Sequence, residues 1–396
     1  MFVALVSAYL LSQFYRAFLS VVAADVMRDL ALDAAALGRL SAVWLLAFAA
    51  AQFPVGLALD RFGPRRTLAF GQFGAVAGAA WFAAARSGPE ATAAMALIGL
   101  GCSPVLMAGF YVIARTYPVG QFATMSSILL GLGSLGDPLS GAPLAYAAGA
   151  IGWRGTIAAM AALTLVSALA VALTLRDPPV APAPGRRTLL SGLREIASRR
   201  TIWPLLPFAF ISYASVLTVR GLWIAPYLAT TRGFDPAEQG GAATAMGLAL
   251  AAGALLYAPL NRFLRSPKLT ASFGGGVTGA ALLALGMSGA WPSGVAVALF
   301  IAIGLFGSSY AIIMAQARSF MPTHLIGVGV TFMNLVFMGG AGVTQWLSGR
   351  YVRAAELAGF PPRDIFSTLF GALGAAFLAA LAVYVLFAPR AQVDAT

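Results

Sequence analysis

Charge and reactive side chains are scarce in this sequence of 396 residues. Only 10% of the residues are charged, and the chain contains one cysteine, Cys102, and one histidine, His324. A single cysteine excludes a disulfide within the chain, and this pair is too small for a Cys/His metal cluster. The sequence also contains no Ser/His/Asp set and no phosphate-binding glycine loop. We therefore expect no metal, no cofactor and no enzymatic activity.

Acidic residues are also few, at 13 against 25 arginines and lysines, which gives a net charge of +12. In a soluble protein this excess would suggest a nucleic-acid partner, but 60% of the residues are hydrophobic and the mean hydropathy is +0.85. Loops of membrane proteins on the cytoplasmic side are rich in Arg and Lys. The expected partner is therefore a lipid bilayer and not a nucleic acid. The first apolar run, which begins at Phe2, lacks a basic n-region, so we interpret it as a retained span.

Long apolar runs, each near the 20 residues that a membrane helix needs, fill most of the chain. Charge, proline and glycine divide them into twelve predicted spans: 2–26, 34–59, 67–86, 91–115, 122–149, 153–175, 202–229, 239–260, 269–290, 294–317, 325–347 and 365–388. A proline-rich, basic stretch, 176–201, separates the sixth span from the seventh. It is expected to be a linker with a short surface helix near Leu189–Ser198. The predicted domains are thus 1–175, the linker 176–201, and 202–396.

The basic residues also predict the orientation. With the N-terminus in the cytoplasm, the inner loops hold fifteen arginines and lysines and the outer loops hold eight. This bias indicates a multi-pass protein of the inner membrane with both termini in the cytoplasm.

One charged turn between two apolar runs is unusually dense in matches to a known motif. The segment GLALDRFGPRR at 56–66 resembles the signature loop between the second and third helices of the major facilitator superfamily, G-x-L-x-D-R-x-G-R-[RK]. The matching residues are Gly56, Asp60, Arg61, Gly63, Arg65 and Arg66. The resemblance implies an all-α integral membrane protein of twelve transmembrane helices in two pseudo-symmetric six-helix bundles around a central cavity. It also implies a secondary transporter that works as a monomer.

The two halves of the chain share weak sequence similarity at an offset of about two hundred residues. Leu59-Asp60-Arg61-Phe62 recurs as Leu260-Asn261-Arg262-Phe263, and the segment from Asp33 to Gly38 parallels that from Asp235 to Gly240. Parallel repeats of this kind are typical of the superfamily, with the substrate site at the midplane between the halves.

The signature loop is predicted to act as a gate. The resemblance implies that Asp60 faces the start of the eleventh helix, near Ile326–Gly329, where a carboxylate interacts favourably with the positive helix end. Arg61, Arg65 and Arg66 would pair with acids or lipid headgroups, and Gly63 would allow the turn. The alternative is that Arg65 and Arg66 only set the topology.

Three ionisable residues lie well inside the predicted spans: Arg16, Asp137 and Arg220. A charge at a helix centre costs about 2.5–3.5 kcal/mol on insertion scales, so each is a functional candidate. Arg16 and Arg220 lie on the first and seventh helices, which are repeat partners, and two guanidiniums facing across a cavity would clamp an anion. This paired-cation arrangement resembles that of oxalate/formate and other organic-anion carriers of the superfamily. The alternative is that Arg16 pairs with Asp137 and that Arg220 snorkels to the outer surface.

Several uncharged side chains are candidates to complete the substrate site. Those nearest in sequence to the two arginines could hydrogen-bond or stack: Gln13, Tyr15 and Trp223. Polar residues of the fourth, tenth and eleventh helices could line the cavity: Tyr111, Tyr310 and Asn334.

Asp137 lies in a degenerate copy of the antiporter motif of the fifth helix, G-x-x-x-G-P-x-x-G-G. Gly133, Pro138 and Gly141 match, whereas Asp137 and Ala142 replace glycines. Small residues here permit close helix packing. A lone buried carboxyl would suit proton coupling, but a carboxylate beside Arg16 would be a structural partner, and the sequence leaves both open.

The sequence therefore predicts a secondary transporter that moves a small, carboxylate-bearing organic anion by alternating access, coupled to H⁺ or to a counter-substrate. The alternative is a drug or metabolite efflux antiporter of the same superfamily, which the fifth-helix motif favours. A membrane enzyme or a sensor without transport activity is the remaining class, and no sequence motif supports it.

Overall fold

Helices joined by turns and short irregular segments make up the described residues. The computed structural model describes residues 1–177, 194–196, 198–287, 292–321 and 326–389, without the side chains of residues 60, 119, 120, 122, 123, 258, 311 and 326–328. No β-strand occurs in these residues. Helices are expected from such apolar runs, because in hydrocarbon every backbone N–H and C=O must bond within the segment.

The helices fall on either side of residues 178–193. Those of the first half (residues 1–177) are α1 (Phe2–Ala17), α2 (Leu19–Asp29), α3 (Ala34–Ala84), α4 (Gly88–Cys102), α5 (Val105–Thr116), α6 (Val119–Ser134), α7 (Gly136–Leu139) and α8 (Ala142–Thr174). Those of the second half (residues 194–389) are the short 3₁₀ helix η1 (Trp203–Leu205), α10 (Leu206–Thr218), the π-helical turn η2 (Val219–Trp223), α11 (Ile224–Arg232), α12 (Pro236–Leu264), α13 (Pro267–Gly286), α14 (Ser293–Phe306), α15 (Tyr310–Ser319), α16 (Ile326–Leu357) and α17 (Pro362–Phe387).

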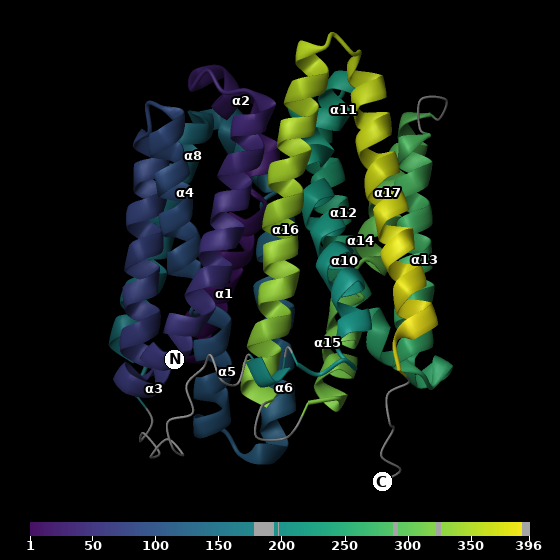
Figure 1. The fold of residues 1–396 in the computed structure, drawn as a ribbon. Coiled ribbons are helices and arrows are strands. Elements are labelled where there is room, and N and C mark those ends of the chain that lie inside the picture. The colour runs from purple at the N-terminus through teal and green to yellow at the C-terminus, as the bar shows by residue number, and fades with distance from the viewer. Residues whose placement is uncertain (178–193, 197, 288–291, 322–325, 390–396) are drawn as a thin grey trace.

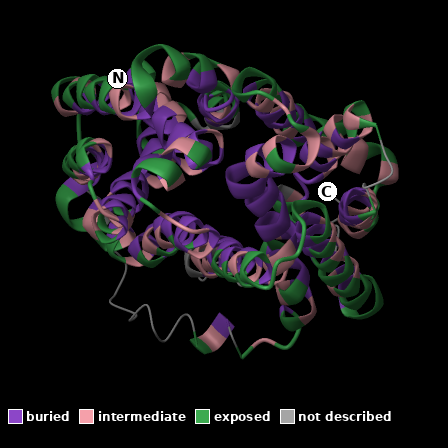
Figure 2. Ribbon diagram, turned by 90° about the horizontal axis from the view of Figure 1, so that it is seen from above, coloured by how far each residue is buried: buried purple, intermediate pink, exposed green. Residues whose placement is uncertain are grey.

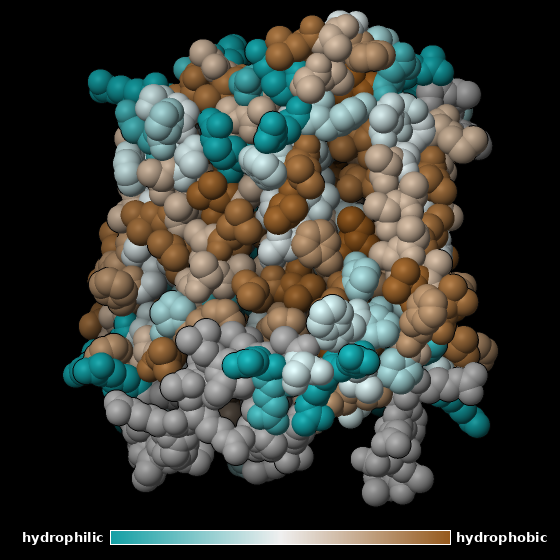
Figure 3. Space-filling model, viewed as in Figure 1, coloured by the Kyte–Doolittle hydropathy of each residue, from teal (hydrophilic) through white to brown (hydrophobic). Residues whose placement is uncertain are grey.

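The surface is that of a membrane protein. On the face that Figure 3 shows, apolar side chains form a band across the middle of the molecule, and polar ones are more frequent toward its two ends. Among the described residues, eight helical segments are long and apolar enough to cross a bilayer, and the bent pair α1–α2 would be a ninth. The all-α membrane fold is thus confirmed. The twelve predicted spans are consistent with the order of elements but stay a prediction.

Both termini lie at the same end of the helix bundle, which is called the termini end below (Figure 1). In the first half α3 packs against α4 and α8, and in the second half α13 packs against α17 and α10 against α16. Viewed along the bundle, buried residues face the inside of each half and exposed residues form the perimeter (Figure 2).

The repeat seen in the sequence is also present in the backbone. Asp33 and Asp235 both cap the N-terminus of a long helix, α3 and α12, by accepting a hydrogen bond from the backbone N–H three residues later. The described residues with positive φ also fall into pairs: Ala31 and Gly233 lie 202 residues apart, as do Gly63 and Arg265, and Gly152 and Gly359 lie 207 apart. The two halves therefore turn in the same way at equivalent positions.

The pair Gly63 and Arg265 gives a test of backbone strain. Gly63 has φ 81° and ψ 166°, a region that only glycine adopts freely, and a Cβ there would lie 2.6 Å from Oδ1 of Asp177. We expect Gly63→Ala to lower the free energy of unfolding by about 2 kcal/mol, whereas Arg265→Gly, at φ 50°, changes it by no more than about +1 kcal/mol. Unfolding by SDS in mixed micelles would measure both. Equal effects of the two substitutions would contradict the strain argument.

The two halves meet closely at the end opposite the termini. A Cβ on Gly38 of α3 would lie 2.8 Å from the Cα of Gly349 on α16, and a Cβ on Gly240 of α12 would lie 3.0 Å from the Cα of Ala142 on α8. These are equivalent crossings, because the offsets between them are again 202 and 207 residues. Asp33 and Arg353 add an ion pair of 3.0 Å at this end, with both side chains 39% exposed.

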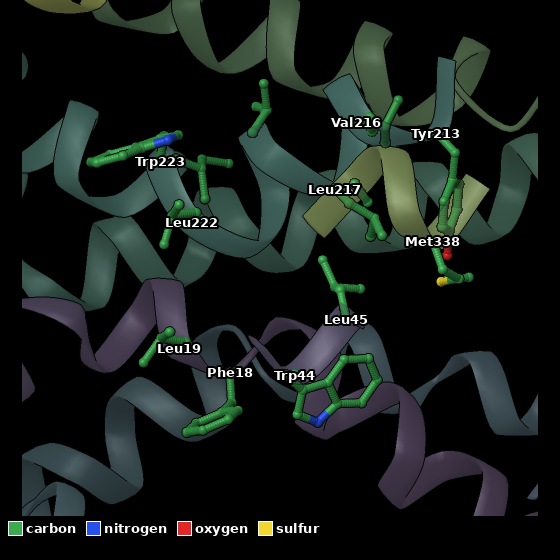
Figure 4. Packing of buried hydrophobic residues seen from close by; sticks show 14 of the residues in the cluster. Phe18, Leu19, Trp44, Leu45, Tyr213, Val216, Leu217, Leu222, Trp223 and Met338 are labelled. Atoms are coloured by element: carbon green, nitrogen blue, oxygen red, sulfur yellow. The ribbon is translucent and has the colours of Figure 1, made fainter. Parts of the chain in front are cut away.

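Apolar side chains seal the contact below these crossings. Leu45 of α3 points across to Leu217 of α10, and Leu19 of α2 lies on the opposite side of the contact from Leu222 (Figure 4). All four are at most 3% exposed. At the termini end, by contrast, the described parts of α5, α6 and α15 have their principal packing partners within their own halves. The halves are thus joined mainly away from the termini.

Candidate functional site

Arg16 lies in the last turn of α1, just before the 53° bend between α1 and α2. Its Nη1 donates a hydrogen bond of 2.8 Å to the hydroxyl of Tyr213 on α10, so this link joins the two halves. The Cζ of Arg16 lies 5.8 Å from the centre of the Trp44 ring and 5.5 Å from that of the Phe48 ring, both on α3. Aromatic faces attract a guanidinium by cation–π interaction. The side chain is therefore held in place by residues of both halves.

No described acidic side chain forms an ion pair with Arg16, and Asp137, which interacts with it electrostatically, is bonded to Arg220. Its Nε is buried and makes no hydrogen bond, and the Tyr213 hydroxyl that accepts a hydrogen bond from its Nη1 is uncharged. An unbalanced charge at this depth is costly, and aromatic contacts offset only part of the cost. The guanidinium is thus suited to bind an anion.

A second aromatic group faces Arg16 from the other half. The ring centres of Tyr213 and Tyr310 lie 5.2 Å apart. The ring centre of Phe337 on α16 lies 6.2 Å from that of Tyr213 and 6.0 Å from that of Tyr310. Tyr213 and Phe337 are buried, whereas Tyr310 is 38% exposed. The structure thus brings the predicted residue Tyr310 close to Arg16, with part of its surface open.

The face of α1 that carries Arg16 also carries Gln13 and Tyr9, three and seven residues earlier. The Oε1 of Gln13 is buried without a hydrogen-bond partner. Tyr9 lies against Gly133 of α6, close enough to Arg16 and Tyr310 to interact with them electrostatically. Sequence reasoning missed Tyr9, although the i, i+7 spacing from Arg16 places both on one helical face.

Arg220 occupies a different position from Arg16. It lies in the π-helical turn η2, is 0% exposed, and its Nε is 3.2 Å from Oδ2 of Asp137 on α7. Its Nη2 donates to the backbone carbonyl of Asp137 at 2.7 Å and to Oγ of Ser140 at 3.0 Å. This ion pair joins the second half to the first in the middle of the bundle.

The structure corrects one alternative from the sequence. Asp137 is paired with Arg220 and not with Arg16, and Arg220 is fully buried and does not snorkel to a surface. The reason is that the two arginines do not occupy equivalent positions. At the repeat offset of 202 residues the equivalent of Arg16 is Thr218, two residues before Arg220, and two residues turn a side chain by about 200° around a helix. With Arg220 neutralised by Asp137, the two guanidiniums do not form a symmetric pair.

Small residues of the predicted fifth helix allow the close contact around Asp137. The backbone N–H of Ala142 donates to Oγ1 of Thr244 on α12 at 2.7 Å, and that hydroxyl donates to the carbonyl of Pro138 at 3.1 Å. Gly141 lies directly against Thr244. The motif residues thus serve packing between the halves, as small residues do in membrane helices.

Two predicted site residues have hydrogen-bond partners other than Arg16. The hydroxyl of Tyr15 bonds to Thr164 of α8 at 2.9 Å, inside the core of the first half. The indole N–H of Trp223 donates to Ser348 of α16 at 2.8 Å, and its ring lines a cavity of about 430 Å³ at the end opposite the termini. Both side chains thus have partners in their own halves.

The remaining predicted lining residues lie nearer the termini end. Tyr111 of α5 is half-buried, with Cζ of Arg115 5.5 Å from its ring centre. Asn334 of α16 is half-buried one turn before Phe337 and Met338, on the helix that contributes to the aromatic group around Tyr310. Among the described residues, no group of three or more His, Cys, Asp and Glu side chains could hold a metal ion.

The signature loop is anchored to the end of α8. The backbone N–H of Arg65 donates to Oδ1 of Asp177 at 2.8 Å, and its Nε donates to the carbonyl of Ala172 at 2.7 Å. Gly63 provides the break in α3 that brings the loop against Asp177. These described contacts lie within the first half, so Arg65 bonds to its own half in this conformation.

The other loop residues are exposed or undescribed. Arg61 lies with its Cζ 5.3 Å from the ring of its neighbour Phe62. Arg66 lines an apolar groove of about 600 Å³ on α3 and α4. The side chain of Asp60 lies outside the described residues, as do those of residues 326–328 that it was predicted to face, so its gating role stays a prediction.

Comparison with known proteins agrees with this architecture. The family model of the Major Facilitator Superfamily matches residues 5–345. A curated relative, the probable L-galactonate transporter of Escherichia coli strain K12, is 28% identical over 245 residues, which cover 56% of this chain and 52% of the relative. The chain thus spans about half the length of that relative.

Solved structures of transporters share the fold. A D-xylose–proton symporter superposes with a TM-score of 0.78 at 16% identity, covering 99% of this chain and 98% of that one. A bacterial homologue of the human lysosomal transporter Spinster, in an inward-facing unoccupied conformation, gives a TM-score of 0.72 at 17% identity, covering 98% and 94%. At these identities the likeness shows the fold alone. The family match, which spans most of the chain, identifies it as a member of the Major Facilitator Superfamily, a membrane transporter and not an enzyme.

Proposed function

We propose that the protein is a secondary transporter for a small organic anion that carries a carboxylate, and that Arg16 binds this carboxylate. The observation that carries the proposal is the guanidinium of Arg16, which lies between the halves without an acidic partner in the described residues. Its planar fork suits a carboxylate and keeps its charge at any physiological pH.

The proposal assigns Arg220 a different role from the one predicted. Since Asp137 balances its charge, Arg220 links the halves and does not form half of an anion clamp. Asp137 is the candidate for proton coupling, because protonation would release Arg220 from its partner. The other possibility is that the pair is structural and that a counter-substrate drives transport. Gln13, Tyr310 and Asn334 would complete the site around Arg16.

Alternating access would occur by rocking of two six-helix domains, 1–175 and 202–396, about the linker 176–201. The excess of basic residues in the loops at the termini end supports a cytoplasmic location for both termini in the inner membrane. The observed conformation, joined away from the termini, would then face inward. The loop with Asp60, Arg61 and Arg65 would bind the second half only when that end closes.

The curated relative agrees with an anionic substrate, because L-galactonate carries one carboxylate. Sugar and nucleoside transporters share the fold as well, so the fold does not select the substrate. Cationic drugs are poorly matched to this site. In the centre of the described bundle Arg16 is a cation without an ion pair, and the acid there, Asp137, is already paired with Arg220.

Counterflow in proteoliposomes tests the proposal. Vesicles with the purified protein, as a monomer in the bilayer, would be preloaded with one unlabelled compound each and exposed to a trace of its labelled form, for a panel of mono- and dicarboxylates and of cationic drugs. We expect transient accumulation of at least one carboxylate and of no cation. Accumulation of cations alone would overturn the proposal in favour of drug efflux.

A further inference from the structure

We infer that the substrate is an aromatic monocarboxylate, a planar ring that carries one carboxylate. The inference rests on the proposed function, because it takes Arg16 as the anion site. It adds the chemical class of the group that carries the carboxylate, which the proposed function leaves open. An aromatic acid also differs from the polyhydroxylated acid that the curated relative's name indicates.

The number of carboxylates follows from the charges. In the described middle of the bundle, Arg16 is the cation without an acid, whereas Arg220 holds Asp137 at 3.2 Å. One free guanidinium balances one carboxylate. A second carboxylate buried beside it would have no cationic partner, which is strongly unfavourable.

The aromatic character follows from the side chains on both sides of Arg16. On the first half, the rings of Trp44 and Phe48 stack with their centres 5.3 Å apart and an angle of 13° between their planes. On the second half, the ring centres of Tyr213 and Tyr310 lie 5.2 Å apart. These two groups belong to opposite halves, and Arg16 lies against both. Trp44, Phe48 and Tyr213 are buried, so Tyr310 is the ring of these groups whose exposed surface a planar ligand could cover.

Tyr310 offers the surface that such a ring would cover. Tyr310 is 38% exposed, although it lies within electrostatic reach of Arg16 and its ring packs against those of two buried residues, Tyr213 and Phe337. A ligand with its carboxylate on Arg16 would extend over this open face. Offset or edge-to-face contact between rings is favourable beyond the area that it buries.

A polyhydroxylated acid is poorly matched to the same site. Each buried hydroxyl needs a hydrogen-bond partner, and one left unpaired weakens binding by roughly ten-fold. Apart from tyrosine hydroxyls, the buried side-chain atoms near Arg16 that lack a hydrogen-bond partner include Oε1 of Gln13 and Nε1 of Trp44. A chain of four or five hydroxyls would therefore leave several unpaired.

Ligand-induced stabilisation of the purified protein in detergent would test the inference without relying on transport. Thermal unfolding would be followed against increasing benzoate, cyclohexanecarboxylate and D-gluconate at pH 7, with Arg16→Gln as the blank. Benzoate and cyclohexanecarboxylate match in size and charge and differ in planarity. We expect benzoate to bind at least about ten-fold more tightly than cyclohexanecarboxylate, and gluconate more weakly than either.

Two variants separate ring from hydroxyl. Tyr310→Leu removes the ring. We expect this variant to bind benzoate about ten-fold more weakly than the native protein does, and to bind cyclohexanecarboxylate with little change in affinity. Tyr310→Phe keeps the ring, and we expect it to retain the preference for benzoate. Should Tyr310→Leu fail to fold, the comparison of the three acids on the native protein and on Tyr310→Phe remains decisive.

The outcomes separate this inference from the proposed function. Tighter binding of gluconate or cyclohexanecarboxylate than of benzoate, lost in Arg16→Gln, would overturn the aromatic class and leave the anion site intact. Equal stabilisation by benzoate in the native protein and in Arg16→Gln would overturn the anion site itself. No stabilisation by any of the three acids, together with no carboxylate counterflow, would overturn both.

Discussion

Arg16→Gln is expected to lower the rate of carboxylate counterflow by about 100-fold, which corresponds to about 3 kcal/mol of lost interaction with the anion. The variant removes the guanidinium that lies between the halves and leaves the aromatic side chains in place. Glutamine retains hydrogen-bonding groups but not the charge. The measurement is initial counterflow rate against substrate concentration, in proteoliposomes matched for the amount of protein.

Two variants control for structure and charge. Tyr213→Phe removes the 2.8 Å hydrogen bond from Arg16 but keeps both the ring and the guanidinium, and we expect a loss of ten-fold or less. Arg16→Lys keeps the charge without the planar fork, and we expect an intermediate loss. Transport by Arg16→Gln at the native rate would show that Arg16 does not bind the substrate.

Asp137→Asn is expected to lower the free energy of unfolding by about 3 kcal/mol, because it leaves Arg220 fully buried without a counter-charge. The side chains are nearly isosteric, so packing around the site is preserved. SDS titration in mixed micelles would measure the change, with the melting temperature as a second readout.

The chain contains a matched control for this prediction. Asp33 and Arg353 also join the two halves, but in an exposed ion pair of 3.0 Å, so Asp33→Asn should cost less than about 1 kcal/mol. Adding Arg220→Met to Asp137→Asn should recover most of the lost stability, since the buried charge is then removed as well. If the double variant is less stable than Asp137→Asn alone, Arg220 stabilises the fold through contacts other than the ion pair.

The fold was largely predictable from the sequence, because the bilayer requires helices wherever apolar runs are long enough. The repeat was visible in the caps Asp33 and Asp235, and the structure extends it to the left-handed turns at Ala31 and Gly233, where the residues differ but the conformation is kept. Sequence identity was lost at these positions while the backbone geometry was conserved between the halves.

The site was only partly predictable. The three charged residues were recognisable by their cost in a membrane, and the two-residue shift between Arg16 and Arg220 at the repeat offset of 202 was visible in the sequence. The pairing of Asp137 with Arg220 depends on how helices of different halves pack, which spacing along one helix does not give. The partners of Arg16, Trp44 and Tyr213, lie on other helices and are ordinary aromatic residues in sequence.

The unequal charges in the middle of the bundle have an electrical consequence. Arg220 and Asp137 sum to zero, so the empty protein carries the single positive charge of Arg16 through its conformational cycle. A bound monocarboxylate cancels it. In an exchange cycle, in which Asp137 stays ionised, a membrane potential that is negative inside therefore acts on the empty protein and not on the loaded one, by up to about 2.3 kcal/mol per 100 mV if the charge crosses the whole field. The voltage would hold the empty site toward the cytoplasm, and electric current would accompany its return and not the passage of the substrate.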